Sequence, residues 1–343
     1  MLLGLIIAAS VVAAVLIAFI VLSALAVHIM FRRRFDGNPN VRYYSAEDFG
    51  MDARPVSFCT DGERVLRGFV YSFKETEPRG VVIFAHGFGA GHTAYTTEIA
   101  FFASRGYLVL AYDCTGCGKS DGKMLGGFDQ GPIDLIAAEK FARKDEQLSA
   151  YKKVLVGHSW GGFSVLNAMG HCEDICGAVA MCGFVAGAPA IAHKAFAKFP
   201  PLCAFTSAFI RVYNAIKFKK NANVNSIRSL KKTNLPVCLV YGGADVVVPY
   251  SYNGARIRKA TAGMPNVRFL LLPEMGHNVY LTREAEQYMN DTFSAVGKAL
   301  RKKDIALAKK LYAEADYKKM TQEDPAVMDY MLRFCDEVCG VKR

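Results

Sequence analysis

VLVGHSWGG, residues 154–162, is the most informative segment of this chain. An apolar run is followed by a glycine, a histidine, a serine and a segment compatible with a helix from Trp160 onward. This order predicts a buried strand, a sharp turn that carries Ser159, and then a helix, which is the setting of a nucleophilic serine. Such a serine has a strained backbone that pushes its hydroxyl out above the sheet. Gly157 and Gly161 flank the serine because a Cβ at either position would collide with the neighbouring strand or helix.

Around this segment, apolar runs alternate with helical patterns. We expect strands at 55–59, 65–73, 81–85, 107–112, 154–157, 178–182, 237–241 and 267–272, and helices at 93–105, 130–144, 160–170, 250–261 and 282–300. The first two strands form a hairpin that turns at Asp61-Gly62. Apolar strands separated by helices predict an α/β fold with a mostly parallel sheet covered on both faces. Reactive groups should then gather in loops at the carboxyl ends of the strands.

Composition divides the 343 residues into four parts. We expect a transmembrane anchor at 1–31, a basic juxtamembrane linker at 32–54, the α/β domain at 55–300 and a C-terminal helical extension at 301–343 that packs on the body. Within the domain, about 185–233 is expected to form a helical lid over the strand ends. Residues 175–244 contain nine Lys and Arg but no Asp or Glu. This basic segment indicates either a solvated helical face or a surface that meets an anionic membrane or an amphiphilic substrate.

The first 31 residues contain no charged side chain. About 20 apolar residues in a helix suffice to cross a bilayer, so this run predicts a membrane anchor. A cleaved signal peptide is the alternative, but it favours a basic start and an apolar stretch of only about 7–15 residues. Arg32, Arg33 and Arg34 follow directly, which predicts a catalytic body on the cytoplasmic side and contact of these arginines with anionic lipids. Membrane electrostatics therefore explains the net charge of +11 with fewer assumptions than nucleic-acid binding does.

The ten cysteines are compatible with a reducing compartment. Cys114 and Cys117 have the spacing of a redox pair or of half a zinc site, but no second pair of ligands completes such a site. Most of the other cysteines lie in apolar runs and are expected in the core. We expect neither a metal nor a cofactor.

A serine hydroxyl needs an oriented base to become a nucleophile at neutral pH. Of the seven histidines, His277 follows the last expected strand and is the only one after Asp245. Asp245 lies in a Gly-rich loop after the strand 237–241, where it alone would indicate a turn. The order Ser159, Asp245, His277 predicts nucleophile, orienting carboxylate and base. His158 is expected to point away from the site.

An oxyanion that forms during acyl transfer needs prepositioned donors. We expect these to be the backbone N–H of Trp160, at the start of the helix after the nucleophile, and the backbone N–H of Phe88, in the loop 86–91. The glycines of this loop have no phosphate-loop register. The Gly-Lys-Ser at 118–120 lacks the first glycine of such a motif, because Asp113 stands there.

In these motifs the chain resembles the serine hydrolases of the α/β-hydrolase superfamily, most of all the serine aminopeptidase-like and monoacylglycerol lipase branch. The resemblance covers roughly residues 55–300 and implies the α/β-hydrolase fold with the triad Ser159, Asp245 and His277. Two positions depart from that branch: Thr115 stands where Arg is usual, and Cys117 stands where His is common. The motifs are His86-Gly87, Gly106-Tyr107, Asp113-x-x-Gly116-x-Gly118-x-Ser120, Gly157-His158-Ser159-Trp160-Gly161-Gly162, Gly243-x-Asp245-x-x-Val248-Pro249 and Gly276-His277.

We therefore expect a membrane-anchored serine hydrolase that cleaves carboxylic esters or thioesters of lipid-like acyl groups. An aminopeptidase-like amide hydrolase is the enzymatic alternative, and it would need acidic residues near the pocket to hold a substrate amine. A non-catalytic ligand sensor or scaffold on the same fold is a further alternative, although such proteins often lose a triad member. The sequence leaves the substrate and the oligomeric state open.

Overall fold

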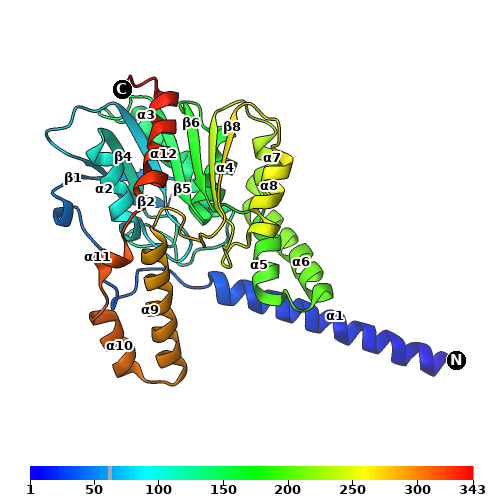
Figure 1. The fold of residues 1–343 in the computed structure, drawn as a ribbon. Helices are drawn as coiled ribbons and strands as arrows, with labels where there is room; N and C mark the ends of the chain where they lie inside the picture. Colours follow the sequence, from blue (N-terminus) through cyan, green and yellow to red (C-terminus); the bar gives the residue numbers. More distant parts are fainter. Residues whose placement is uncertain (61–63, 343) are drawn as a thin grey trace.

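The computed structural model describes residues 1–60 and 64–342 (Figure 1). Its centre is an eight-stranded sheet in the order β1-β2-β4-β3-β5-β6-β7-β8. β1 pairs antiparallel with β2 and β2 with β4, whereas the remaining pairings are parallel. The expected α/β fold is confirmed, while the expected turn at Asp61-Gly62 lies outside the described residues. The strands are β1 Asp52–Cys59, β2 Val65–Ser72, β3 Gly80–Ala85, β4 Tyr107–Tyr112, β5 Lys153–His158, β6 Gly177–Met181, β7 Val237–Gly242 and β8 Val267–Leu272.

Helices cover both faces of this sheet, which explains why the central strands are apolar throughout. In β3, Val81 and Ile83 belong to one buried cluster, and Val82 and Phe84 belong to the other. The first face is covered by α3 (Gln130–Lys144), α4 (Trp160–Ala168) and α8 (Gly254–Ala260). The second face is covered by α2 (Thr96–Ser104), the start of α9 (Arg283–Arg301) and α12 (Pro325–Cys339). Burial on two faces favours near-continuous apolar strands over alternating ones.

Three helices lie between β6 and β7, where the lid was expected. They are α5 (Gly187–Phe196), α6 (Pro200–Phe218) and α7 (Ser226–Leu230), and we call residues 185–233 the insertion.

Asp129, just before α3, joins the insertion to the rest of the domain through hydrogen bonds. Its Oδ2 accepts hydrogen bonds from Asn214 Nδ2 at 3.1 Å and from the backbone N–H of Asn223 at 2.6 Å. Burial raises the pKa of Asp129 to about 6, because water no longer solvates the carboxylate.

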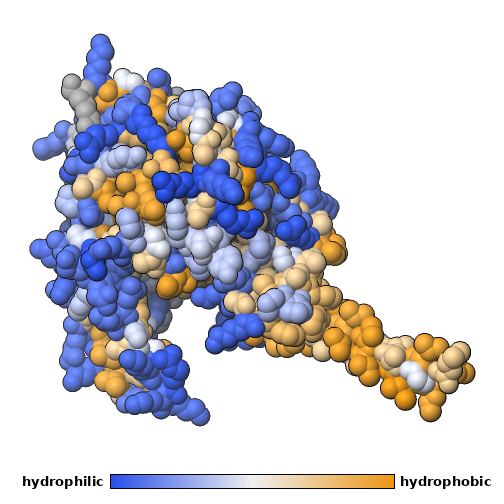
Figure 2. Space-filling view, turned by 45° about the vertical axis from the view of Figure 1, so that its right-hand side comes forward, coloured by the Kyte–Doolittle hydropathy of each residue, from blue (hydrophilic) through white to orange (hydrophobic). Residues whose placement is uncertain are grey.

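The chain begins with α1 (Leu2–Phe31), a helix long and apolar enough to cross a membrane. It extends away from the body as an apolar rod (Figures 1 and 2). The 21 residues from Leu2 to Leu22 stand almost wholly exposed and span about 30 Å, the thickness of a bilayer core.

The last turns of α1 are built into the body. Ser23 is fully buried and its hydroxyl forms a 2.8 Å hydrogen bond with the hydroxyl of Thr206 in α6. Val27 and Phe31 are also buried. The expected apolar helix is therefore present, but it is more than an appended segment, because its end packs against the insertion.

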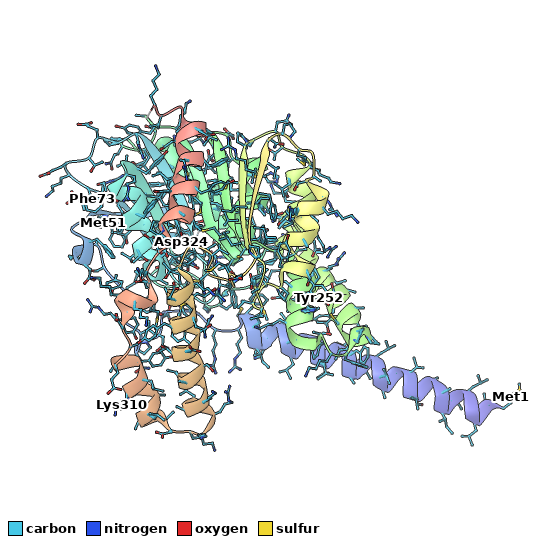
Figure 3. The ribbon with its side chains drawn as sticks, in the orientation of Figure 1. Met1, Met51, Phe73, Tyr252, Lys310 and Asp324 are labelled. Carbon is cyan, nitrogen blue, oxygen red and sulfur yellow. The ribbon has the colours of Figure 1, made fainter. Side chains whose placement is uncertain are left out.

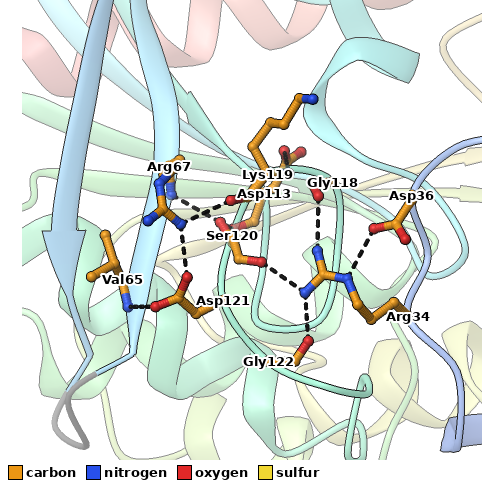
Figure 4. A network of polar contacts seen from close by, with 10 residues as sticks. All are labelled: Arg34, Asp36, Val65, Arg67, Asp113, Gly118, Lys119, Ser120, Asp121 and Gly122. Atoms are coloured by element: carbon orange, nitrogen blue, oxygen red, sulfur yellow. Dashed lines mark hydrogen bonds and ion pairs between the residues drawn. The ribbon is translucent and has the colours of Figure 1, made fainter.

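Arg34 corrects one expectation about the segment that follows α1. Its guanidinium donates to the carbonyl oxygens of Gly118 at 2.8 Å and Ser120 at 2.9 Å, and also to that of Gly122 (Figure 4). It also forms a 3.0 Å ion pair with Asp36. The Arg34 guanidinium therefore binds the loop 118–122 and is not available for the expected lipid contact. Arg32 and Arg33 are exposed, and for them the expected contact stays a prediction.

The chain ends with α10 (Ile305–Ala313), α11 (Tyr317–Met320) and α12. α9 and α10 form a hairpin that extends from the body, with Lys310 towards its free end (Figure 3). α12 returns to the sheet, where Met331 and Phe334 join the core. Tyr107 of β4 donates a 2.9 Å hydrogen bond to Asp336 of α12.

Candidate active site

Ser159 lies in the turn between β5 and α4 with φ 59° and ψ −114°, a backbone conformation that is costly for a residue with a side chain. The glycines on either side make this turn possible. A Cβ on Gly157 would come within 2.5 Å of the Gly161 backbone, and one on Gly161 within 1.9 Å of the Ala85 carbonyl oxygen. The turn is therefore tight because α4 packs directly on β3 and β5, as the glycine spacing predicted.

Asp245 and His277 meet at the carboxyl end of the sheet. His277 Nδ1 donates to Asp245 Oδ2 at 2.7 Å, while Asp245 Oδ1 accepts from the N–H groups of Val247 and Val248, both at 2.8 Å. The Asp245 side chain is only 1% exposed and that of His277 is 11% exposed. This arrangement orients the imidazole, and among the described residues no hydrogen bond occupies its Nε2, which can therefore accept a proton.

Two further groups hold the His277 loop, and sequence reasoning missed both. Glu286 of α9 accepts from the backbone N–H of Gly276 and that of Asn278, both at 2.8 Å. His158 Nε2 lies 2.9 Å from the carbonyl oxygen of His277. Hydrogen bonds thus hold the loop at the residues before and after His277 and at the backbone carbonyl of His277 itself. No local pattern marks Glu286, because its partners are backbone groups.

His158 does not point away from the site, as was expected. It is 2% exposed, and burial together with nearby His277 holds its pKa well below the ordinary value. The neutral ring donates from Nε2 to the His277 carbonyl and accepts at Nδ1 from the Tyr95 hydroxyl, 2.9 Å away. The same hydroxyl accepts the N–H of Gly87 at 3.1 Å. One chain of hydrogen bonds therefore links the loop before Phe88 to the loop that carries His277.

Three of the predicted residues, Ser159, His277 and Phe88, line one cavity of about 300 Å³, whereas Asp245 and Trp160 lie behind its wall. Its lining includes Ser159, His277, Phe88, Phe184 and, from the end of α1, Met30. Ser159 and His277 both line this cavity, and within the described part of the chain no hydrogen bond joins their side chains. Such contacts often tighten only when substrate binds.

The expected oxyanion residues lie on the same side of the site. The rings of Phe88 and Trp160 are 5.9 Å apart, and the Trp160 Nε1 donates to the Phe128 carbonyl at 2.8 Å. The Trp160 backbone N–H is the first of α4, where helix donors have no partner within the helix. A Cβ on Gly87 would lie 3.6 Å from Ser159 Cβ, so the loop 86–91 approaches the serine closely.

His92 and the paired cysteines have structural roles. His92 Nδ1 contacts Asp113 Oδ1 at 2.8 Å, and hydrogen bonds from His92 and Lys119 hold the pKa of this buried carboxyl below its ordinary value. Cys114 and Cys117 are buried, which raises the pKa of both thiols.

Within residues 1–60 and 64–342, His158, Cys182 and His277 form the one group close enough to hold a metal ion, with ligand atoms within 4.8 Å of each other. Hydrogen bonds already occupy both His158 nitrogens and His277 Nδ1. Burial also raises the pKa of Cys182, which disfavours the thiolate that a metal would bind.

Several known proteins resemble parts of this chain. The family model of the S33 serine aminopeptidases matches residues 76–228. A non-heme chloroperoxidase of Streptomyces lividans is 32% identical over 124 residues, which make up 36% of this chain and 42% of that protein. A monoacylglycerol lipase of Mycolicibacterium smegmatis is 33% identical over 90 residues, 26% of this chain and 31% of that protein. The matched part of the chain thus spans less than half the length of these curated relatives.

Solved structures extend the likeness over most of the chain. An esterase of Pyrococcus furiosus is 22% identical with a TM-score of 0.55, and the match covers 79% of this chain and 98% of the esterase. A puromycin hydrolase is 15% identical with a TM-score of 0.56, and the match covers 86% of this chain and 40% of that one. At these identities the likeness shows the fold alone. Sheet order, serine elbow and sequence matches together show that the chain belongs to the α/β-hydrolase superfamily.

Proposed function

We propose that the protein is a membrane-anchored serine hydrolase that cleaves carboxylic esters or thioesters of lipid-like acyl groups. The observation that carries this proposal is the cavity that the strained Ser159 and His277 both line, while Asp245 holds the imidazole of His277. A scaffold or sensor has no need of an oriented imidazole and a strained serine in the wall of one cavity. The name of the lipase relative agrees with acyl-ester chemistry.

The geometry supports a two-step acyl transfer. Ser159 Oγ attacks the acyl carbonyl carbon while its proton passes to His277 Nε2, and Asp245 stabilises the resulting imidazolium. The oxyanion is stabilised by the N–H groups of Phe88 and Trp160. His277 then gives the proton to the departing alkoxide or thiolate, which leaves an acyl group on Ser159. Water, deprotonated by the same imidazole, releases the acid and restores the serine.

The α1 helix supports the membrane part of the proposal. Its exposed length matches a bilayer core, and its last turn contributes Met30 to the catalytic cavity. Phe31 packs edge-to-face on Phe88 and Phe128, with ring centroids 5.8 and 5.2 Å away. A cavity walled by the end of a membrane helix favours amphiphilic substrates. Exposed Arg32 and Arg33 favour a body on the cytoplasmic side.

A fluorophosphonate probe tests the nucleophile in the full-length protein. We expect the probe to label the wild type and to fail on Ser159→Ala, with His171→Ala, outside the cavity, as a matched control that keeps labelling. Labelling that survives Ser159→Ala would refute the assignment. Acyl esters of increasing chain length test the lipid part, and a steady loss of turnover beyond short chains would refute it. A reporter fused to the carboxyl terminus tests the orientation.

A further inference from the structure

The catalytic cavity adjoins a second cavity of different chemistry. The second one has a volume of about 450 Å³ and lies between α5, the loop after β7 and α8. The two cavities share four wall residues, Ala190, Lys194, Val247 and Val248. The two cavities are therefore neighbours, with Lys194 in the wall of both. Together the cavities reach the size of ordinary small-molecule sites.

The second cavity is basic. Lys194 and Arg256 line it together with His193. The centroid of the His193 ring lies 4.4 Å from that of Tyr252, labelled in Figure 3, and the two rings are tilted by 48°. Among the described residues, neither Lys194 nor Arg256 takes part in an ion pair, and no Asp or Glu lines either cavity. The acid-free sequence of 175–244 explains this, because α5 has no carboxylate to offer. Two cations thus face an open cavity with no anion beside them.

Both cavities are lined mostly by apolar residues, but the catalytic cavity has Lys194 as its one cation among the described residues and adds aromatic rings. Phe88, Phe128, Phe184 and Ile191 line it beside Ser159. An acyl chain is stabilised on such a surface by each methylene that it buries there. The two cavities therefore suit the two ends of one amphiphile, with the reacting carbonyl at the junction.

We propose that the preferred substrates are single-chain acyl esters whose alcohol part carries a phosphate, which binds Lys194 and Arg256 while the acyl carbonyl lies at Ser159. This inference rests on the proposed hydrolase function and names its substrate class. Arginine binds phosphate oxygens with two parallel N–H donors, and lysine adds a compact charge. A substrate with a free amine meets two like charges and no carboxylate, which disfavours aminopeptidase activity.

The test compares two substrates that differ only in the phosphate, oleoylglycerol phosphate and oleoylglycerol. The full-length protein in neutral phosphatidylcholine nanodiscs hydrolyses both, and the measured quantity is the ratio of their kcat/KM values. We expect a ratio of at least about 10 in the wild type, a fall of about threefold in Lys194→Met or Arg256→Gln, and a ratio near 1 in the double variant. The ratio should also fall as salt rises from about 0.05 to 0.5 M, because both cations are exposed to solvent.

Lys198→Met is the matched control, because this lysine is exposed just after α5 but lines neither cavity. It should keep the wild-type ratio. A wild-type ratio near 1, or an equal fall in Lys198→Met, would overturn the phosphate site while leaving the hydrolase intact. If the wild type hydrolyses the substrates but the fluorophosphonate probe does not label Ser159, the proposed function is overturned, and this inference with it. Labelling that persists without phosphate preference overturns the inference alone.

Discussion

Tyr95→Phe removes one hydroxyl that joins the two loops of the candidate site. That hydroxyl accepts from the Gly87 N–H at 3.1 Å and donates to His158 Nδ1 at 2.9 Å, and all of these groups are buried. Its loss leaves two buried polar groups unpaired, at a cost of about 1–3 kcal/mol each. Because the phenylalanine ring still packs on Phe84, we expect the free energy of unfolding to fall by about 2–4 kcal/mol.

The same change should slow catalysis, because the Gly87 N–H and the His158 ring each help to position a group that is expected to take part in the reaction. Gly87 precedes the expected oxyanion donor Phe88, and His158 holds the carbonyl of His277. A shift of about 1 Å in such a group lowers rates by about 100-fold. We expect kcat for a short neutral ester to fall about 10- to 100-fold, measured by stopped assays on the full-length protein in detergent beside its denaturation curve.

Tyr107→Phe is the matched control. Its buried hydroxyl donates to Asp336 at 2.9 Å, at the amino-terminal end of the parallel strands and away from Ser159. This variant should lose stability and keep the wild-type kcat. The reasoning is refuted if Tyr95→Phe loses stability but keeps its kcat, or if Tyr107→Phe loses as much kcat as Tyr95→Phe.

Three further changes test other contacts. Phe31→Ala should lower the free energy of unfolding by about 3 kcal/mol and reduce long-chain turnover more than short-chain turnover, whereas Leu16→Ala, on the exposed part of α1, should do neither. Glu286→Gln keeps one acceptor oxygen instead of two beside His277, so kcat should fall about tenfold while KM stays within about twofold. Asp129→Asn should flatten the dependence of stability on pH. The Asp129 carboxyl binds its proton more tightly in the folded protein than in the unfolded chain, so its protonation stabilises the fold. This contribution is complete below about pH 4 and is lost as the pH rises through about 6, and it amounts to at most about 3 kcal/mol. Denaturation midpoints of both proteins between pH 4 and 7.5 give the difference, and parallel curves would contradict the prediction.

The parallel sheet and the serine elbow could be predicted from the sequence because both depend on local patterns. A strand buried on two faces must be apolar throughout, and a turn with a positive φ at Ser159 requires glycines where α4 and β3 approach. Boundaries were less accurate. β1 begins at Asp52 rather than at residue 55, and the helix expected at 250–261 is a short 3₁₀ turn followed by α8.

The contacts that hold the site could not be predicted, because they depend on where distant segments meet. Arg34 follows a membrane-like helix and resembles a lipid contact, yet the loop 118–122 offers it three carbonyl oxygens. His158 follows a strand and was expected to leave the site, but it bridges Tyr95 and the His277 loop. In both cases the partner includes a backbone carbonyl oxygen, which any residue type supplies, so no residue pattern records it. The roles of Ser159 and the oxyanion donors stay predictions until they are measured.

α1 ends in Met30 and Phe31, and Met30 forms part of the wall of the catalytic cavity. The other end of the same rigid helix lies in the proposed membrane, so a change in its tilt moves this wall. A spanning helix adjusts its tilt when the hydrocarbon layer becomes thinner or thicker. Such a tilt would press on Phe88 and Phe128 through the Phe31 ring and so change the width of the space in front of Ser159. Bilayer thickness then becomes a variable of the hydrolysis rate, alongside substrate concentration and pH.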